Sequence, residues 1–552
     1  MAGVPLKPMR LAPLPVSFLA FLGGFSTMVV ELAAVRVLAP AFGDSIPVWT
    51  NVIGVILFAL AVGALLGGYL ADRGRGRGTL PLLFAFAGAL ILSVPELAPR
   101  IASWILPDTD LPLDRALPLL VEGSLSVTLL AFAPAVLLLG ALAPLLIRGG
   151  SEGDMAHVGR ISGLVYASGT LGSLLGTFLT TYWLVPYLGV ANTYRLAGGL
   201  LLVAAILAYL LSRSREPVAM VVSVVPILMA LGLHLLETPK PQWLRPGQRI
   251  LEQVDSPYQR LYVVEDTEEV QGKKRRVRML KINEGLDSFH SVRIEGTAFT
   301  GGRYYDAFAL LPMLIDEPSD SPVRALSLGC AAGSILRVLE AVLGSHLQAV
   351  GVELDPGVLA LADKWFRGFD KRIPDSADIH WIGDLGARAY VNFVHRDQPP
   401  FDIICIDAYR SQFYIPAQLS TVEFFESLKG RLAAGGVLAL NVGDFSSEGP
   451  VLSAVAGTLA SVFPTVESFR VGGQRNFLVL AHGQAPGILS RAVRTHTRPE
   501  GLSERIWAAA GRTGACRTWT ALPEDRRLED GRSDLGRLHE GIYRSLYSFE
   551  DE

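Results

Sequence analysis

The sequence is poor in cysteine and almost balanced in charge, and both shortages exclude kinds of protein. Its three cysteines, Cys330, Cys405 and Cys516, stand far apart, so they form neither a zinc-binding pattern nor a disulfide framework. The formal net charge of −3 gives no sign of a protein that binds nucleic acid through bulk positive charge. We therefore expect no metal site, no nucleic-acid partner and no permanently bound cofactor.

Long apolar segments are abundant, and they lie before about residue 237. Half of all residues are hydrophobic and the mean hydropathy is +0.37, both high for a soluble protein. A helix needs roughly 20 apolar residues to cross about 30 Å of hydrocarbon. Seven segments qualify, at 16–38, 50–71, 79–98, 117–147, 161–185, 190–211 and 217–236. Residues 1–237 are thus expected to form a helical membrane domain of about seven spans. The fourth segment is too long for one straight span, so either Pro134 and Pro144 kink it or part of it lies in the membrane interface.

Small residues recur four apart within these segments. Gly63 and Gly67 form one such pair, and Ser168, Gly172 and Gly176 form a longer series. This spacing lets helix backbones approach closely in lipid. Packing within one bundle is favoured over a dimerisation motif.

The charges of the first half leave two questions open. Glu31 lies inside the first segment and Arg36 near its end. Either these charges are functional, or Arg36 reaches the membrane interface and Glu31 pairs with a neighbouring helix. Basic residues favour an internal N-terminus. Seven spans would then place the remaining domain outside the cytoplasm, unless the count of spans is off by one. We expect a multi-pass protein of the cell (inner) membrane with a cytoplasmic soluble domain; otherwise the domain is extracytoplasmic.

The second half has the pattern of a soluble α/β protein. Residues 238–249 are a linker and 250–320 a small β-rich region, whose strands at 260–265 and 277–282 are divided by the charged stretch 266–276. From 321 to 485 strands alternate with helices, which predicts a Rossmann-like domain of the class I methyltransferase type. Strands are expected at 323–328, 349–352, 379–382, 402–406, 436–442, 466–471 and 476–481, and helices at 334–343, after Asp355 and at 421–432. The polar tail 486–552 receives no role.

Polar residues and glycines follow four successive strands of this domain. In such sheets ligands bind beyond the carboxyl ends of the strands. The loop Gly329-Cys-Ala-Ala-Gly333 permits a tight turn and close backbone approach. Glu353 can accept both hydroxyls of a ribose, Asp384 is placed to meet an adenine amino group, and Asp407 lies beside the expected reaction centre. The loop lacks the triphosphate-binding pattern, so a nucleoside with a methionine-derived tail fits better than ATP. The alternative is that these residues are ordinary helix caps and turn formers.

The order of these motifs resembles that of the spermidine synthase (polyamine aminopropyltransferase) family. The matching segments are Ser256-Pro-Tyr-Gln259, Tyr304-Tyr-Asp306, the glycine loop, Gly351-Val-Glu-Leu-Asp355, Gly383-Asp384 and Phe401-Asp-Ile-Ile-Cys-Ile-Asp407. Four other segments resemble the membrane-embedded branch of that family, namely Leu38-Ala-Pro-Ala-Phe-Gly43, 63–68, Asp72-Arg73 and Ile415-Pro-Ala-Gln-Leu-Ser-Thr-Val-Glu-Phe424.

The resemblance implies transfer of an aminopropyl group from decarboxylated S-adenosylmethionine, as co-substrate, to an amine such as putrescine, with release of methylthioadenosine. It implies that Asp407 is the catalytic base, since a carboxylate can bind an ammonium group and then accept its proton. It also implies a nucleoside site that contains Gln259, Tyr304, Gly329, Gly333, Glu353 and Asp384.

Two positions depart from the family's pattern. Ala332 stands where the loop usually carries an Asp that contacts the amino end of the donor, and Arg410 stands where a second Asp follows the catalytic one. Tyr305 and Asp306 also replace more usual residues. Two like charges about 4 Å apart repel by about 4 kcal/mol at an effective dielectric constant of about 20, so Arg410 disfavours a diamine. The acceptor stays open.

Two other functions remain alternatives to aminopropyl transfer. One is methyl transfer from S-adenosylmethionine to a lipid or membrane-bound acceptor, and the other is a membrane transporter or sensor whose soluble domain only binds a nucleoside. The expected partners are the lipid bilayer, a small amine substrate and a second copy of the chain.

Overall fold

The computed structural model describes most of the chain, which divides into two compact units. The described residues are 12–42, 46–73, 76–105, 121–151, 155–212, 244–256, 258–282, 289–315, 321–370, 376–394, 398–409, 415–472 and 475–530, with the single residues 232, 535 and 538. The first unit comprises Met1–Trp243 with Asp255–Arg260, and the second Leu244–Val254 with Leu261–Glu552. The expected span 217–236 lies outside the described residues except for residue 232, and Arg410 also lies outside them.

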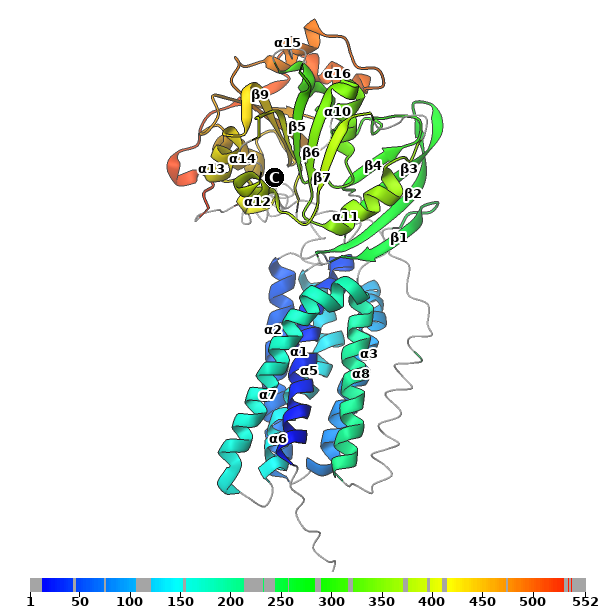
Figure 1. Ribbon diagram of the computed structural model, residues 1–552, viewed down its shortest axis with the longest axis vertical. Coiled ribbons are helices and arrows are strands. Elements are labelled where there is room, and N and C mark those ends of the chain that lie inside the picture. Colours follow the sequence, from blue (N-terminus) through cyan, green and yellow to red (C-terminus); the bar gives the residue numbers. More distant parts are fainter. Residues whose placement is uncertain are drawn as a thin grey trace, which may run out of the picture. The chain divides into compact units, whose positions relative to one another are not determined.

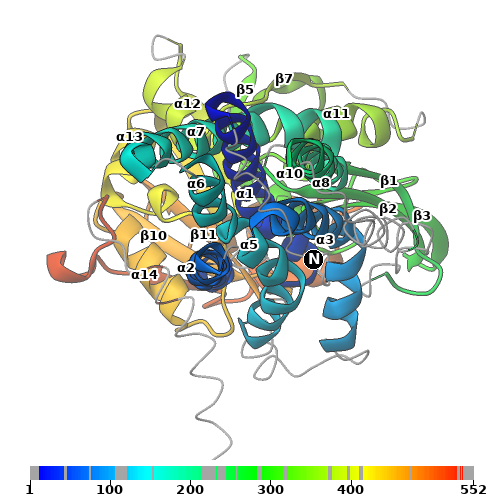
Figure 2. The same cartoon turned by 90° about the horizontal axis from the view of Figure 1, so that it is seen from below.

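The first unit is a bundle of long apolar helices (Figures 1 and 2). Its helices are α1 (Pro13–Phe42), α2 (Ile46–Asp72), α3 (Gly76–Ile105), the stretch 121–151 with η1 (Thr128–Phe132), α5 (Ala133–Gly140) and α6 (Leu142–Ser151), then α7 (Val158–Leu179), η3 (Thr180–Leu184) and α8 (Val185–Ser212). Within the described residues, five helical stretches are long and apolar enough to cross a membrane. The last, Val158–Leu211, is broken at Gly189, whose φ of 76° and ψ of 166° are not helical. This break lies inside α8, whereas η3 joins α7 to α8, and α1 packs against both α7 and α8 (Figure 1).

Two prolines disturb the stretch 121–151 as the sequence predicts. Pro134 follows the π-helical turn η1, and a turn at Ala141 separates α5 from α6, three residues before Pro144. Proline has no N–H to donate to the carbonyl four residues earlier, and the helix accommodates the unpaired carbonyl by a π-turn or a break.

The glycines that recur four apart bring helices of the bundle together. A Cβ at Gly172 would collide with the backbone carbonyl of Phe21 in α1, and a Cβ at Gly63 with that of Leu137 in α5. The expectation of close packing within one bundle is therefore confirmed for these helices. An ion pair that the sequence did not indicate adds to it: Arg195 Nη2 of α8 lies 2.9 Å from Glu96 Oε1 of α3.

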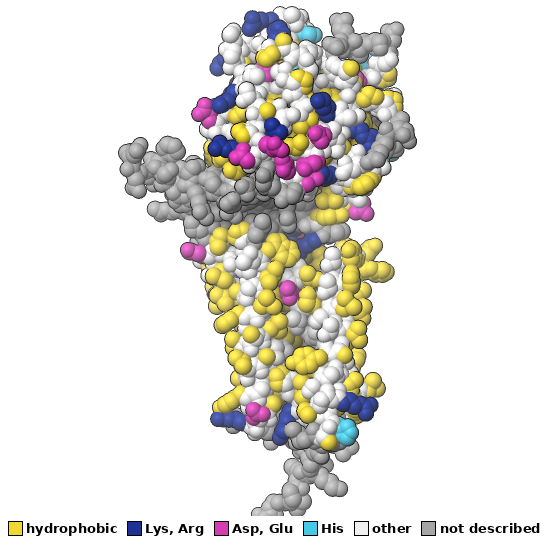
Figure 3. Space-filling model, turned by 90° about the vertical axis from the view of Figure 1, so that its left-hand side faces the viewer, with side chains coloured by type: hydrophobic (Ala, Val, Ile, Leu, Met, Phe, Trp, Pro, Cys, Tyr) yellow, Lys and Arg dark blue, Asp and Glu magenta, His cyan; other side chains and the backbone are white. Residues whose placement is uncertain are grey.

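Apolar side chains dominate the visible face of the helical unit (Figure 3). Phe58, Leu65 and Leu171 expose 66%, 77% and 57% of their surface. Soluble monomers rarely expose contiguous apolar surface of this extent.

The second unit begins with a small antiparallel sheet. Its strands are β1 (Arg249–Asp255), β2 (Arg260–Val270), β3 (Lys273–Ile282) and β4 (Ser291–Ile294), paired in that order. The expectation that 266–276 divides two strands is wrong, because this stretch forms the β2–β3 hairpin. Glu268 faces Arg275 and Glu269 faces Lys274, so opposite charges pair across the strands. Gln271 and Gly272, with φ of 54° and 71°, form the tight turn.

The main sheet has eight strands with helices on both faces, and it confirms the Rossmann-like fold class (Figure 1). The strands are β5 (Val323–Leu328), β6 (Leu347–Val352), β7 (Asp378–Ile382), β8 (Phe401–Ile406), β9 (Leu432–Gly443), β10 (Thr465–Arg470), β11 (Asn476–His482) and β12 (Cys516–Trp519). Their order is β12-β10-β11-β9-β8-β5-β6-β7. Strands β9, β8, β5, β6 and β7 run parallel to one another, whereas β11, β10 and β12 extend the sheet antiparallel.

The helices of the second unit cover the two faces of the main sheet. One face carries α12 (Ala387–Phe393), α13 (Val422–Lys429) and α14 (Pro450–Leu459), whose apolar residues share a buried core with the strands. The other face carries η4 (Tyr304–Met313), α10 (Ser334–Leu343) and α11 (Pro356–Leu361) (Figure 1). Asp355 caps α11 by accepting from Gly357 N at 2.9 Å, as its position before Pro356 predicts. The helix expected to reach residue 432 ends at Lys429, where Gly430 follows.

The close packing of α1 and α7 gives a test. Gly172→Ala should reduce the free energy of unfolding by about 1–3 kcal/mol, the usual cost of overpacking, because the new methyl group meets the carbonyl of Phe21. Gly163→Ala, in the same helix but with open space around it, should instead be neutral or stabilising by up to about 1 kcal/mol through helix propensity. Thermal unfolding of both variants in detergent measures the difference, and equal stabilities would contradict the packing.

Candidate active site at the carboxyl edge of the sheet

The glycine loop after β5 is shaped by close backbone approach. Gly329 has a φ of 74°, and a Cβ there would lie 2.7 Å from Ala408 Cα and 2.8 Å from Asp407 O. Only glycine fits both the conformation and the space. Gly333, with φ of 89°, likewise faces the ring of Trp381, whose Cη2 would lie 2.6 Å from a Cβ. The two glycines therefore hold the loop between the ends of β8 and β7.

Glu353 closes the other side of the same loop. Its carboxylate accepts hydrogen bonds from Ala331 N at 2.9 Å and Asp355 N at 3.1 Å. Burial raises the pKa of Glu353 to about 7, although these backbone hydrogen bonds oppose the change. Glu353 N donates to Ile382 O at 2.9 Å, which joins the ends of β6 and β7. The carboxylate is thus fixed at the edge where the strands end.

Asp384 follows β7 in an unusual backbone conformation. Its φ is 59°, in the left-handed region that non-glycine residues seldom adopt. Such residues cost of order 1–3 kcal/mol each and cluster at functional sites. The side chain is exposed.

Asp407 lies at the end of β8 with both carboxylate oxygens hydrogen-bonded. Tyr304 OH donates to Oδ2 at 2.8 Å and Asn441 Nδ2 donates to Oδ1 at 2.8 Å. Asn476 Nδ2 in turn donates to Asn441 Oδ1 at 3.1 Å, so a chain of two amide side chains leads to Asp407 Oδ1. Burial raises the pKa of Asp407 to about 6, against the hydrogen bonds from Asn441 and Tyr304. A carboxylate with a pKa in this range can act as a general base near neutral pH.

The aromatic side of the site comes from the start of η4. The rings of Tyr304 and Tyr305 lie 4.0 Å apart between centroids, and Tyr305 OH donates to Phe289 O at 3.1 Å. Burial raises the pKa of both tyrosines well above the ordinary value, so both hydroxyls stay protonated and donate. The Asp306 carboxylate accepts hydrogen bonds from Thr300 N, Thr300 Oγ1 and Gly302 N, so it binds the segment that precedes η4.

The structure brings several of the sequence-predicted residues together. Tyr304 and Gly329 both meet the segment that contains Asp407, while Glu353 holds the middle of the glycine loop and Asp384 follows the neighbouring strand. Gln259 belongs to Asp255–Arg260, which groups with the first unit, and its carbonyl accepts from Ser256 N at 2.9 Å.

Ala332 is used differently from the acidic residue that the resemblance leads one to expect. Its N–H donates to Ser291 Oγ of β4 at 2.9 Å, and its methyl group packs against the apolar cluster around Leu261 and Leu280. This position therefore fastens the glycine loop to the small sheet.

Sequence reasoning missed Asn441, Asn476 and Tyr409. Tyr409 OH donates to Asn441 O at 2.8 Å and accepts from Gly443 N at 3.0 Å, which ties the residues after β8 to β9. One signal was available, because asparagine is depleted in strands and Asn441 interrupts an otherwise apolar run. Such a residue in a central strand indicates a polar partner nearby.

The relatives found among known proteins include polyamine aminopropyltransferases. No family model matches the chain. The chain is 31% identical over 179 residues to a probable polyamine aminopropyl transferase of Bifidobacterium longum, covering 32% of this chain and 36% of that relative. It is 25% identical over 427 residues to a polyamine aminopropyltransferase of Mycobacterium tuberculosis, covering 75% of this chain and 76% of that relative. The chain thus spans only about a third of the length of the first of these.

Among solved structures, a probable spermidine synthase from Corynebacterium glutamicum aligns with a TM-score of 0.36 and 23% identity, over 52% of this chain and 98% of that one.

The hydrogen bonds to Asp407 predict how its pKa responds to substitution. Asn441→Ala removes a donor that stabilises the carboxylate, so the pKa of Asp407 should rise above its value of about 6. Asn476→Ala, which removes only the outer bond of the chain, should raise it less. A pH titration of the protonated carboxyl infrared band, with Asp407→Asn as the reference, measures both. A pKa unchanged in Asn441→Ala would contradict the assigned hydrogen bond.

Proposed function

We propose that the chain is a polyamine aminopropyltransferase that transfers an aminopropyl group from decarboxylated S-adenosylmethionine to an amine, in keeping with relatives of that name that match most of its length. Methylthioadenosine is the other product. The observation that carries the proposal is the Asp407 carboxylate, held between Tyr304 and Asn441 beside the glycine loop.

The proposed reaction needs a base more than an acid. An amine reaches the site protonated at neutral pH, and the Asp407 carboxylate binds the ammonium group and takes one proton from it. The nitrogen lone pair then forms a bond to the aminopropyl carbon, the carbon–sulfur bond breaks, and its electron pair goes to the sulfonium sulfur. The leaving thioether is neutral, so no proton has to be supplied to it. Each carboxylate oxygen keeps a further lone pair beside the one used by Tyr304 or Asn441, so the site has room for the ammonium hydrogen bond.

The donor nucleoside is proposed to lie along the same edge of the sheet. Glu353 would accept the ribose hydroxyls, and Asp384 would accept from the adenine amino group. Gly329 and Gly333 would let the donor approach the backbone, and Tyr304 would line the site. Support comes from the placement of the glycine loop, Glu353 and Asp384 after three adjacent strands.

The acceptor is proposed to be an amine other than a small diamine. The acidic residue of the family's loop is replaced by Ala332, whose N–H and methyl group contact the small sheet. Arg410 replaces the second acidic residue after Asp407, and a guanidinium does not lose its proton near neutral pH. An amine that carries an anionic group would be attracted where a second ammonium group would be repelled.

A product assay with purified full-length protein tests this function. Putrescine, agmatine, spermidine and an amino acid amine are each offered with decarboxylated S-adenosylmethionine, and methylthioadenosine release is expected with at least one of them. Asp407→Asn should lower that turnover by about 10²–10⁴, the usual worth of a positioned base. The kcat/KM should fall as the pH drops through about 6, because the raised pKa of Asp407 leaves the base protonated below that value.

Two results would contradict the proposal. One is turnover that is indifferent to Asp407→Asn. The other is release of S-adenosylhomocysteine from S-adenosylmethionine with no methylthioadenosine from the decarboxylated donor, which would identify a methyltransferase.

The first unit is proposed to anchor the enzyme in a membrane. Its described helices have the length and composition of membrane spans, and they expose large apolar side chains. The full chain should therefore stay with membranes in an alkaline carbonate wash and leave them only in detergent. Release by carbonate alone would be the behaviour of a peripheral protein and would defeat this anchor.

A further inference from the structure

The C-terminal part of the second unit runs from β12 past α14 to the start of α13. Strand β12 pairs with β10 at the edge of the sheet, and Trp519 Nε1 donates to Ser468 Oγ at 2.9 Å. We call residues 520–530, which follow β12, the C-terminal strap. The sequence assigns this polar stretch no role.

The strap is fastened by backbone hydrogen bonds along its length. Leu522 N donates to Gly457 O at 3.1 Å, and Leu528 N donates to Thr458 Oγ1 at 3.1 Å, both in α14. Val422 N at the start of α13 donates to Leu528 O at 2.9 Å. The Leu528 side chain is only 3% exposed and belongs to the buried core. These contacts fix where the next residues, including Asp530, arrive.

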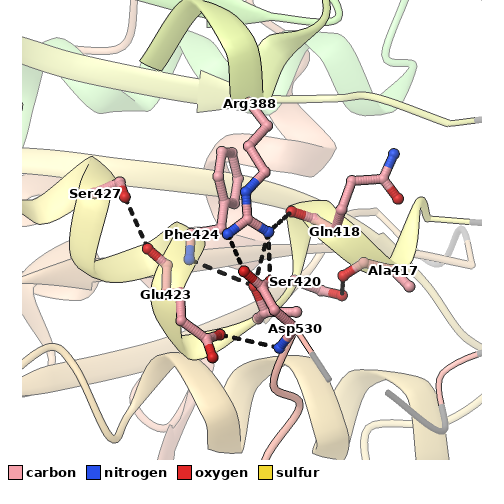
Figure 4. Close-up of polar contacts among 9 residues, drawn as sticks. Arg388, Ala417, Gln418, Ser420, Glu423, Phe424, Ser427 and Asp530 are labelled. Atoms are coloured by element: carbon pink, nitrogen blue, oxygen red, sulfur yellow. Dashed lines mark hydrogen bonds and ion pairs between the residues drawn. The ribbon is translucent and has the colours of Figure 1, made fainter. Parts of the chain in front are cut away.

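Asp530 joins two separate segments of the site's edge (Figure 4). Its two carboxylate oxygens accept from Arg388 Nη1 and Nη2, and Oδ1 also accepts from Thr421 Oγ1 at 2.8 Å. Arg388 Nη1 donates in addition to Gln418 O at 3.1 Å, and Asp530 N donates to Glu423 Oε2 at 3.2 Å. The Arg388 hydrogen bond holds the pKa of Asp530 below its usual value, so the carboxylate is charged at neutral pH.

The partners of Asp530 stand next to the residues proposed to bind the two substrates. Arg388 is the second residue of α12, which begins three residues after Asp384. Gln418 and Thr421 lie in the segment that leads into α13 after β8 and Asp407, and Thr421 is the cap of that helix. Both helices begin at the carboxyl edge of the sheet, because each follows a parallel strand. Asp530 thus links the helix that follows the proposed donor residue Asp384 to the segment that follows the proposed base Asp407.

The strength of this link argues for positioning rather than for overall stability. Arg388 and Asp530 expose 23% and 43% of their side chains, and exposed ion pairs contribute little to folding. The fork-shaped pairing of a guanidinium with a carboxylate nevertheless fixes direction as well as distance. The pair therefore fixes where α12 and the segment before α13 stand relative to each other.

We propose that Asp530 is a positioning residue, which sets the spacing between the proposed donor-binding turn at Asp384 and the segment 415–421, which follows the proposed base Asp407. This role rests on the proposed aminopropyl transfer. Asp530 touches neither substrate; it acts through Arg388 and Thr421. The binding of both substrates should therefore depend on it more than the chemical step does, since Asp407 is held by Tyr304 and Asn441 alone.

The test compares Asp530→Asn with Asp525→Asn in the full-length protein in detergent. Asp525 is an exposed acid of the same strap, in η8 (Glu524–Arg526), so the control removes the same charge nearby. In Asp530→Asn the Kd of methylthioadenosine should rise about fivefold, and the KM of the best amine from the product assay about tenfold, while kcat stays within about twofold. Asp525→Asn should change none of these, Asp530→Glu should recover at least half of the lost affinity, and Glu353→Ala reports the loss of a direct nucleoside contact.

The outcomes separate this proposal from the proposed function. An Asp530→Asn protein with the Kd and KM of the Asp525→Asn control would overturn the positioning role. So would a lower kcat and a lower melting temperature at unchanged Kd and KM, since that pattern belongs to a structural residue, and so would failure of Asp530→Glu to recover affinity. If the wild type turns over no amine, the proposed function fails, and the Kd comparison alone still decides whether the strap controls the nucleoside side.

Discussion

The approach of Gly329 to the backbone of Asp407 and Ala408 is the constraint on which the site depends. Two neighbouring parallel strands, β5 and β8, end at the same level, and the chain can turn away from both ends only if one of them carries no side chain. This close approach puts the glycine loop, which reaches Glu353 on one side, directly against the backbone of Asp407 on the other. The remaining contacts, from Tyr304, Asn441 and Ala331, arrange polar groups around a distance that the backbone has already set.

The two carboxylates at this edge, Asp407 and Glu353, receive different kinds of hydrogen-bond donor. Burial raises the pKa of both Asp407 and Glu353, but their donors are of different kinds. Glu353 receives backbone N–H groups, which belong to the loop and cannot turn away. Asp407 receives a phenol and an amide from side chains. Fixed donors suit a group that only has to hold hydroxyls, whereas rotatable donors can follow a carboxylate whose charge changes during a reaction.

Local sequence signals were sufficient for the elements that carry the proposed site, and insufficient for the contacts that complete it. The apolar strands with a glycine or an acid after each could be read directly, because strand ends in a parallel sheet meet at one edge. The prediction for the charged stretch 266–276 was wrong, because a run of charged residues is typical of a loop. In the structure opposite charges face each other across two strands of this stretch. Asn441 could have been noticed as a polar residue in a buried strand. Arg388 and Asp530 could not, since they are 142 residues apart and each looks like an ordinary surface charge.

The position of the strap in the chain has a consequence for the order in which the protein matures. Asp530 is synthesised 142 residues after its partner Arg388 and 109 residues after its partner Thr421. Contacts of such long sequence separation form late in folding. The helical unit, together with the glycine loop and Asp407, can be in place while the two sides of the site are still free to move apart. The nascent chain therefore passes through a stage at which Arg388 and Thr421 are present but Asp530 does not yet join them, and synthesis of the strap ends that stage.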